Sequence, residues 1–142
     1  MKNYMRYWRL IRYYYLQKYN ITESELDLLL YVYSEKYFTM TDCQVFMQTF
    51  SWSRTRFSIL KSKGFIDIHS HAHANSASIW KITFKGKKLV ASLYDKLEGG
   101  KISENYQFNR LFLKEAGYAH KTYKNAIRQM NEEIRTGKFK DD

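Results

Sequence analysis

The stretch from Ser51 to Gly64, SWSRTRFSILKSKG, holds a helix start, a helix end and one apolar face. Ser51 can accept hydrogen bonds from the free N–H groups of the first turn, and Gly64 can adopt the left-handed conformation that ends a helix. The spacing predicts a helix over about 52–63 with Phe57 and Leu60 pointing inward. No other stretch limits the fold as strongly, because residues 51–64 assign one helix face to a core and leave the other face uncovered.

The outward face of this helix is basic and polar. Residues 51–64 include Arg54, Arg56, Lys61 and Lys63 and no Asp or Glu, so the local charge is +4. Donors without carboxylates suit phosphates and the edges of purines. We interpret the segment as a DNA-reading helix, and the sequence leaves open a solvated basic helix face as the alternative.

Composition sets the outer limits. At 142 residues the chain is long enough for one domain with a core, and its net charge of +10 favours a polyanionic partner. The single cysteine, Cys43, excludes an internal disulfide and a Cys-based zinc site; we expect a small buried side chain, with redox sensing as the alternative. No run approaches the roughly 18 apolar residues of a membrane span, and residues 1–19 interleave Arg and Tyr too often for a signal peptide. We therefore expect a cytoplasmic protein that does not enter a membrane.

The positive charge is unevenly spread along the chain. Residues 1–20 carry +5, residues 21–50 carry −4, residues 51–64 carry +4, residues 65–100 carry +2 and residues 101–142 carry +3. The sequence thus concentrates its cations in the first predicted helix and in the reading helix.

The first helix, predicted over residues 3–19, has an aromatic stripe that is too broad for one small core. The stripe consists of Tyr4, Trp8, Ile11, Tyr15 and Tyr19, widened by Tyr7 and Tyr14. A helix that is apolar on more than one side needs a second surface, and another subunit is the simplest source. The alternative is a helix that covers its own domain and leaves tyrosines exposed.

Capping patterns predict the other helices. Thr22 with Glu25 and Thr41 with Gln44 are capping boxes, which open a core helix and a short third helix before the reading helix. Two short helices joined by a tight turn form a helix-turn-helix. The remaining helices are predicted from Phe84 to about Glu98, capped by Thr83, and over about 104–116 and 120–135.

Two alternating segments after Gly64 predict a β-hairpin. Residues 65–70 and 78–83 are the predicted strands, and the small polar segment 71–77 is a long tip. His69, His71 and His73 alternate, which on a strand would place three imidazoles on one face. Zinc binding is one interpretation, and solvated or phosphate-contacting histidines are the other.

Two local motifs lie at the two ends of this hairpin. Leu60-Lys-Ser-Lys-Gly64-Phe-Ile66 has the pattern Leu-x-x-x-Gly-hydrophobic-Ile, and Ile82-Thr83-Phe-Lys-Gly86-Lys-Lys-Leu89 is close to Leu-Thr-x-x-Gly-x-x-Leu. With the order of elements over residues 20–98, these motifs resemble the winged helix-turn-helix of the MarR family of transcriptional regulators. The resemblance implies a mainly α fold with a small β-hairpin wing, flanked by N- and C-terminal dimerisation helices.

The resemblance also implies a homodimer whose two reading helices enter successive major grooves of DNA. Residues 1–20 and 99–136 would supply the dimerisation helices, residues 21–98 the DNA-binding domain and residues 137–142 a loose tail. A small-molecule ligand often regulates the family, and nothing in this sequence identifies one. We expect the subunit contact to include Tyr4, Trp8, Ile11, Tyr15, Leu111, Phe112, Tyr123 and Ile127.

Residues of the reading helix and the wing are the expected DNA contacts. Base edges would be read by Arg54, Thr55, Arg56 and Ser58. The family's wing arginine has no counterpart between His71 and Ala77. Trp52 can stack on DNA or pack on its own domain. Backbone and wing contacts are expected from Ser51, Trp52, Lys61, Lys63, His71, His73, Asn75, Lys81 and Lys85.

Motifs of catalysis are missing from the sequence. It has no Gly-rich phosphate loop, no nucleophile elbow and no His-Glu-x-x-His pattern. We therefore expect no enzyme, no cofactor and no metal. A rival to the regulator is a winged-helix protein-interaction or assembly module, such as a component of a phage particle or a transcription complex, without sequence-specific DNA binding.

Overall fold

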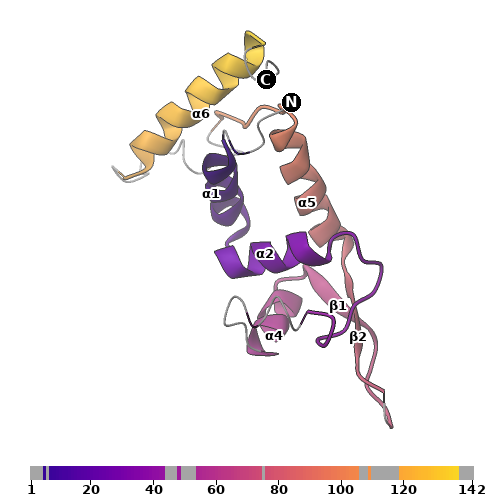
Figure 1. Ribbon diagram of the computed structural model, residues 1–142. Helices are drawn as coiled ribbons and strands as arrows, with labels where there is room; N and C mark the ends of the chain where they lie inside the picture. Colours follow the sequence, from indigo (N-terminus) through magenta and orange to yellow (C-terminus); the bar gives the residue numbers. More distant parts are fainter. Residues whose placement is uncertain are drawn as a thin grey trace. The chain divides into compact units, whose positions relative to one another are not determined.

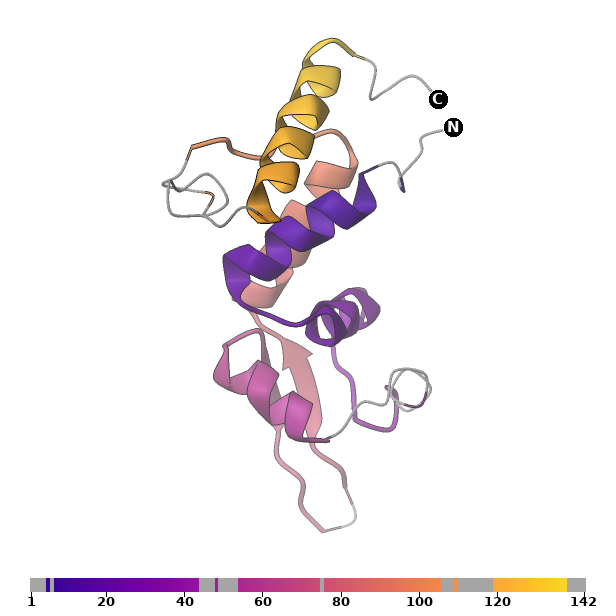
Figure 2. The ribbon, with the colours of Figure 1, turned by 90° about the vertical axis from the view of Figure 1, so that its left-hand side faces the viewer.

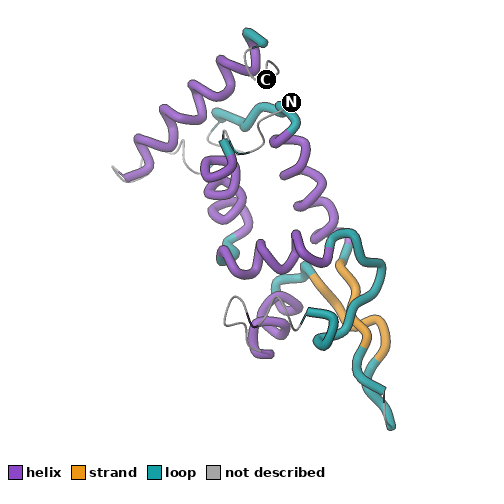
Figure 3. The backbone as a smooth tube through the Cα atoms, in the orientation of Figure 1, coloured by secondary structure: helices purple, strands orange, loops and turns teal. Residues whose placement is uncertain are grey.

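The computed structural model describes residues 5, 7–43, 48, 54–74, 76–105, 109 and 119–137, with the side chains of residues 54, 119 and 120 outside this description. The chain forms two compact units. One consists of Ile21–Ala91, and the other joins Met1–Asn20 to Ser92–Asp142. The described residues are mainly helical with one small antiparallel hairpin, which confirms the coarse fold class (Figures 1 and 3).

In the Ile21–Ala91 unit, helix α2 spans Glu23–Val32 and helix α4 spans Arg54–Ser62. The predicted cap of α2 is confirmed, because Thr22 Oγ1 accepts a hydrogen bond from the Glu25 N–H at 3.2 Å. Apolar residues three and four apart on α2 are buried and supply part of the core: Leu26, Leu28, Leu29 and Val32.

Gly64 ends α4 in the left-handed conformation, with φ +86°. The N–H of Gly64 donates to the carbonyl of Lys61 at 2.9 Å, and the N–H of Phe65 donates to the carbonyl of Leu60 at 3.2 Å. This pair of bonds is a Schellman motif, which satisfies the last helix carbonyls and reverses the chain toward the hairpin. The predicted helix stop at Gly64 is confirmed.

Strand β1 (Ile66–Ser70) pairs with strand β2 (Ile79–Ile82) in an antiparallel hairpin. A register shift between Ile68 and Ser70 interrupts the ladder. Beyond the strands, His73 and Ser76 form a further antiparallel bridge, so the predicted long tip narrows to a tight turn. The hairpin extends well past the end of α4 (Figure 2).

Phe38 adds a single bridge to the other edge of β2, which the sequence analysis did not predict. Its N–H donates to the Trp80 carbonyl at 3.0 Å, and the Trp80 N–H donates to the Phe38 carbonyl at 2.8 Å. Trp80 in turn packs on Phe57 of α4, with ring centroids 5.6 Å apart. The hairpin and α4 therefore share one core.

Helix α5 (Phe84–Leu97) begins directly after its cap residue Thr83, as predicted. Thr83 Oγ1 accepts the Gly86 N–H at 3.2 Å and donates to the Gly64 carbonyl at 2.6 Å. The helix backbone approaches β1 so closely at Gly86 that a Cβ there would overlap the Phe65 carbonyl oxygen and lie 2.7 Å from Ile82 Cγ1.

In the other unit, helix α1 (Trp8–Tyr19) packs against helix α6 (Ala119–Arg135). Tyr13 and Tyr123 stack with their ring centroids 3.7 Å apart, and Tyr7 donates a hydrogen bond to Glu133. Buried Asn131 of α6 binds the backbone of Ile102 at both ends of its amide, at 3.0 and 2.7 Å. Side-chain polar bonds thus hold the segment after α5 to α6.

Two predicted helix boundaries need correction. Glu104 and Asn105 are not helical, although a helix was predicted from 104; most of the rest of 104–116 lies outside the described residues. A reciprocal capping box is formed by Thr39 and Asp42, because each side chain accepts the other's N–H, at 2.8 and 3.2 Å. This box precedes the predicted box at Thr41, whose partner Gln44 lies outside the described residues.

The first helix begins at Trp8, later than predicted, because Tyr7 is a turn residue in the described part of the chain. The two compact units divide within α5, after Ala91, ahead of the predicted boundary at 98.

We predict that Gly86→Ala lowers the free energy of unfolding by at least about 2 kcal/mol, because the new methyl group would overlap a backbone oxygen that cannot move alone. Urea denaturation measures the loss. Lys87→Ala, at an exposed position of the same helix turn, is the matched control and should change stability by no more than about 0.5 kcal/mol. Equal stability of the two variants would show that the close approach is not needed.

Candidate nucleic-acid interface

Helix α4 separates its residues as the sequence predicted. Phe57 and Leu60 are fully buried, while Thr55, Ser58 and Lys61 are exposed. Trp80 of β2 covers Phe57, so the buried face of α4 rests on the hairpin. The described residues of the opposite face are exposed from Thr55 to Ser62.

The outermost strip of α4 is uncharged. Its members lie three or four residues apart and are all exposed: Thr55, Ser58, Ile59 and Ser62. Cationic residues occupy the flanks of this strip, with Lys61 on one side and Arg56 and Lys63 on the other. The described part of α4 has no carboxylate, so the strip and its flanks can approach a polyanion without repulsion.

Of the two arginines predicted to read bases, the structure describes the side chain of Arg56 and not that of Arg54. The backbone of Arg54 begins α4, but its side chain lies outside the described residues. Arg56 is half-buried and engages another group of the protein.

Lys63 is held by the protein itself. Its ammonium lies 2.9 Å from Oε2 and 3.3 Å from Oε1 of Glu25, whose side chain is 3% exposed against 29% for Lys63. This ion pair joins the end of α4 to the first turn of α2. Lys63 was predicted to contact phosphate. Such a contact would compete with this ion pair, because the nearly buried carboxylate would be left unpaired.

Lys85 also contacts groups of its own unit. Its Nζ donates to the Lys63 carbonyl at 2.8 Å and lies 4.6 Å from the centroid of the Phe65 ring. A cation at the C-terminal end of a helix binds the free carbonyls and favours the helix dipole. Lys85 thus stabilises the end of α4, at the base of the hairpin and not at its tip.

The hairpin presents polar groups on both arms. His71, His73 and Lys81 are exposed. Ala74 has a positive φ of 50° at the tip, and the Ala72 N–H donates to Ser78 Oγ at 3.0 Å below it. These contacts hold the two arms together beyond the strands, so the exposed histidines extend from an ordered ribbon.

The three histidines of this region do not form one face. The register shift at His69 breaks the alternation, and His69 stacks on Tyr37 with ring centroids 4.2 Å apart. Among the described residues, no three His, Cys, Asp or Glu side chains gather closely enough to hold a metal ion.

Three expected DNA contacts cannot be placed. Ser51, Trp52 and Asn75 lie outside the described residues.

Three of the eight residues predicted at the subunit contact are buried within this chain. Ile11, Tyr15 and Ile127 are fully buried, and the Tyr15 hydroxyl lies 2.5 Å from Ser92 Oγ. Burial raises the pKa of Tyr15 above its ordinary value, more than the hydrogen bond between Tyr15 and Ser92 lowers it. These three residues form part of the interior of their own unit. For Ile11 and Tyr15 of the aromatic stripe, this agrees with the alternative of a helix that covers its own domain.

The other predicted contact residues divide into two groups. Trp8 and Tyr123 are half-buried, and Tyr123 is already stacked on Tyr13. Tyr4, Leu111 and Phe112 lie outside the described residues.

Charge is distributed over both units. The Ile21–Ala91 unit has nine Lys and Arg against six Asp and Glu, a net charge of +3, and the other unit has 15 against eight, a net charge of +7. Within the Ile21–Ala91 unit, residues 51–64 carry +4 and residues 65–91 carry +3, against −4 for residues 21–50. In the part of the chain that the structure describes, no helix is both long and apolar enough to cross a bilayer.

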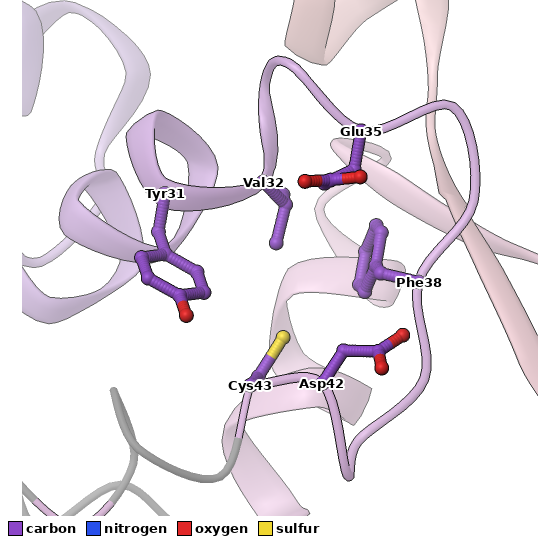
Figure 4. A pocket seen from close by; sticks show the side chains of 6 residues that line it. All are labelled: Tyr31, Val32, Glu35, Phe38, Asp42 and Cys43. Carbon is purple, nitrogen blue, oxygen red and sulfur yellow. The ribbon is translucent and has the colours of Figure 1, made fainter.

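A cavity of about 420 Å³ lies beside Cys43 (Figure 4). Cys43 is fully buried, and burial together with the neighbouring Asp42 carboxylate raises the pKa of its thiol to about 11. A neutral, enclosed thiol fits the structural interpretation of Cys43 and not redox sensing. The cavity is lined by Tyr31, Val32, Glu35, Phe38, Asp42 and Cys43.

Comparison of the chain with protein-family models, curated proteins and solved structures found no match. Function is therefore inferred from the residues and their geometry.

We predict that Lys63→Ala lowers the free energy of unfolding by about 1–3 kcal/mol, because Glu25 would stay nearly buried without its counter-ion. Lys61→Ala, two residues earlier and exposed, should change it by less than about 0.5 kcal/mol. Urea denaturation of the two variants provides the comparison. If both variants were as stable as the parent protein, the ion pair would have no structural role.

We predict that iodoacetamide alkylates Cys43 at pH 8 at least about a hundredfold more slowly in the folded protein than in urea. A thiol with a pKa near 11 has a thiolate fraction about a hundred times smaller than one with the ordinary value of 9.0, and burial limits access further. Mass spectrometry measures the rate. The folded-state rate should rise as the pH approaches 11, and equal rates at pH 8 would contradict the assignment.

Proposed function

We propose that the protein is a sequence-specific double-stranded DNA-binding transcriptional regulator with a MarR-like winged helix-turn-helix, acting as a homodimer. Helix α4 enters the major groove, and the hairpin lies along the backbone as a wing. The observation that carries the proposal is the open face of α4, an uncharged strip with cations at its flanks. The major groove is about 12 Å wide and accepts an α-helix with its side chains.

The uncharged strip matches the base edges of a duplex, and its cationic flanks match the phosphates. Hydroxyl groups of Thr55 and Ser58 can donate to and accept from base edges, which carry both kinds of partner. Lys61 can reach the phosphates at the groove edge, where a cation adds affinity without sequence preference. Position and charge therefore assign base reading to the centre of α4 and backbone contact to its flank.

The hairpin supports the same orientation. His71, His73 and Lys81 are exposed on a ribbon that projects beyond α4. Exposed imidazoles and an ammonium can donate hydrogen bonds to phosphate oxygens. The tip has no arginine between His71 and Ala77, so we assign it backbone contact and not minor-groove reading.

A second function, as a protein-interaction or assembly module, has one observation in its favour. Phe84 is 82% exposed at the start of α5, and Tyr94 on the same helix is 43% exposed. Large exposed aromatic residues are enriched where proteins meet other proteins. Such a module would bind duplex DNA without sequence preference or not at all.

We predict that gel-shift selection from a random duplex library enriches a defined, near-palindromic sequence. If a dimer neutralises about 6–10 phosphates, its affinity for that sequence should fall by about 10³–10⁵ between 50 and 200 mM salt, because binding releases condensed counterions. Lys61→Ala should reduce the magnitude of the salt slope by about one for each protomer while retaining the preferred sequence. Recovery of no preferred sequence would favour the assembly module, and a flat salt response would exclude phosphate-driven binding.

A further inference from the structure

We propose that Ile59 of α4 reads thymine in the bound duplex by packing against its C5-methyl group. The proposal rests on the proposed function and adds a specificity residue outside the predicted base-reading set. Ile59 is 38% exposed, although the two apolar residues beside it in the sequence, Phe57 and Leu60, are fully buried.

The place of Ile59 on the helix is set by the core. Because Phe57 and Leu60 are buried, Ile59 falls on the opposite side of the helix, between Thr55 one turn before and Ser62 one turn after. It therefore lies in the uncharged strip that would face the floor of the groove, and not on the cationic flanks.

The neighbours of Ile59 make the middle of the strip partly apolar. Ser62 Oγ donates to the Ile59 carbonyl at 2.6 Å, so the hydroxyl hydrogen is used within the helix. Thr55, one turn earlier, carries a methyl group beside its hydroxyl, and both residues are exposed. An aliphatic side chain between a bonded hydroxyl and a threonine methyl suits an apolar partner better than a purine edge.

Thymine is the base whose major-groove edge offers such a partner. Its C5-methyl is the apolar group among the donors and acceptors of the four bases. Lys61 at the flank of the strip can hold a phosphate while the isoleucine contacts the methyl. The chemistry therefore selects a T·A pair in the groove under the middle of α4.

The test removes only that methyl group. The duplex enriched from the random library is synthesised with uracil in place of thymine at one position at a time. At one position in each half-site, we expect the affinity of the parent protein to fall about fourfold, the equivalent of one methylene no longer buried. Ile59→Ala should bind the thymine and uracil duplexes equally, and Ile59→Val should keep part of the difference.

Matched controls separate this contact from general binding. Lys61→Ala should weaken binding to both duplexes and keep the fourfold ratio, because its ammonium contacts phosphate. Thermal melting by circular dichroism checks that Ile59→Ala is folded, as the exposed position predicts.

Two results would overturn the assignment while leaving DNA binding intact. One is an unchanged affinity at every uracil position, and the other is an undiminished thymine preference in Ile59→Ala. If the library yields no enriched duplex, the proposed function fails first and this contact fails with it.

Discussion

The structure of the Ile21–Ala91 unit depends on one junction, where the end of α4, the start of β1 and the start of α5 meet. Thr83 closes it, because its hydroxyl donates to the Gly64 carbonyl and its N–H donates to the Phe65 carbonyl at 3.0 Å. Gly86 lets the first turn of α5 lie directly on that backbone. The bonds that close this junction join main-chain groups to the short side chain of Thr83, so it can tolerate little displacement. The direction in which α4 leaves the core is fixed here.

The same junction explains why two short sequence motifs were informative. Leu60 and Gly64 set the Schellman motif, while Thr83 and Gly86 set the cap and the close approach that meet it. Caps and glycine stops depend on neighbours in the sequence, so the helix cap at Thr22 was also predictable. The strand positions were predictable because residues alternate over 65–70 and 78–83. The motifs are therefore two halves of one contact, and their joint presence carries more information than either alone.

Pairings between distant residues could not be predicted in the same way. The Lys63–Glu25 ion pair joins two helices, and the Phe38–Trp80 bridge adds a backbone pair that no local pattern marks. The register shift at His69 removed the alternation that a regular strand would have given. Ile11 shows the same limit, because an apolar stripe reveals that a side chain will be buried but not whether its own chain or another subunit covers it.

The ion pair at Lys63 changes how charge on α4 should be interpreted. A count of cations treats Arg56, Lys61 and Lys63 alike, but Lys63 is committed to Glu25 and Arg56 to another group, which leaves the exposed Lys61 as the clearest backbone contact among these three. In the proposed function, affinity for a polyanion would then depend on cations from both copies of α4 and of the hairpin, which would favour a dimer over a single protomer. Sequence preference would depend on the uncharged strip instead, because a phosphate contact is the same at every base pair whereas Thr55, Ser58 and Ile59 would meet groups that differ. A structural lysine at the end of α4 is compatible with this division, since it fixes the angle of the strip without adding affinity for every sequence.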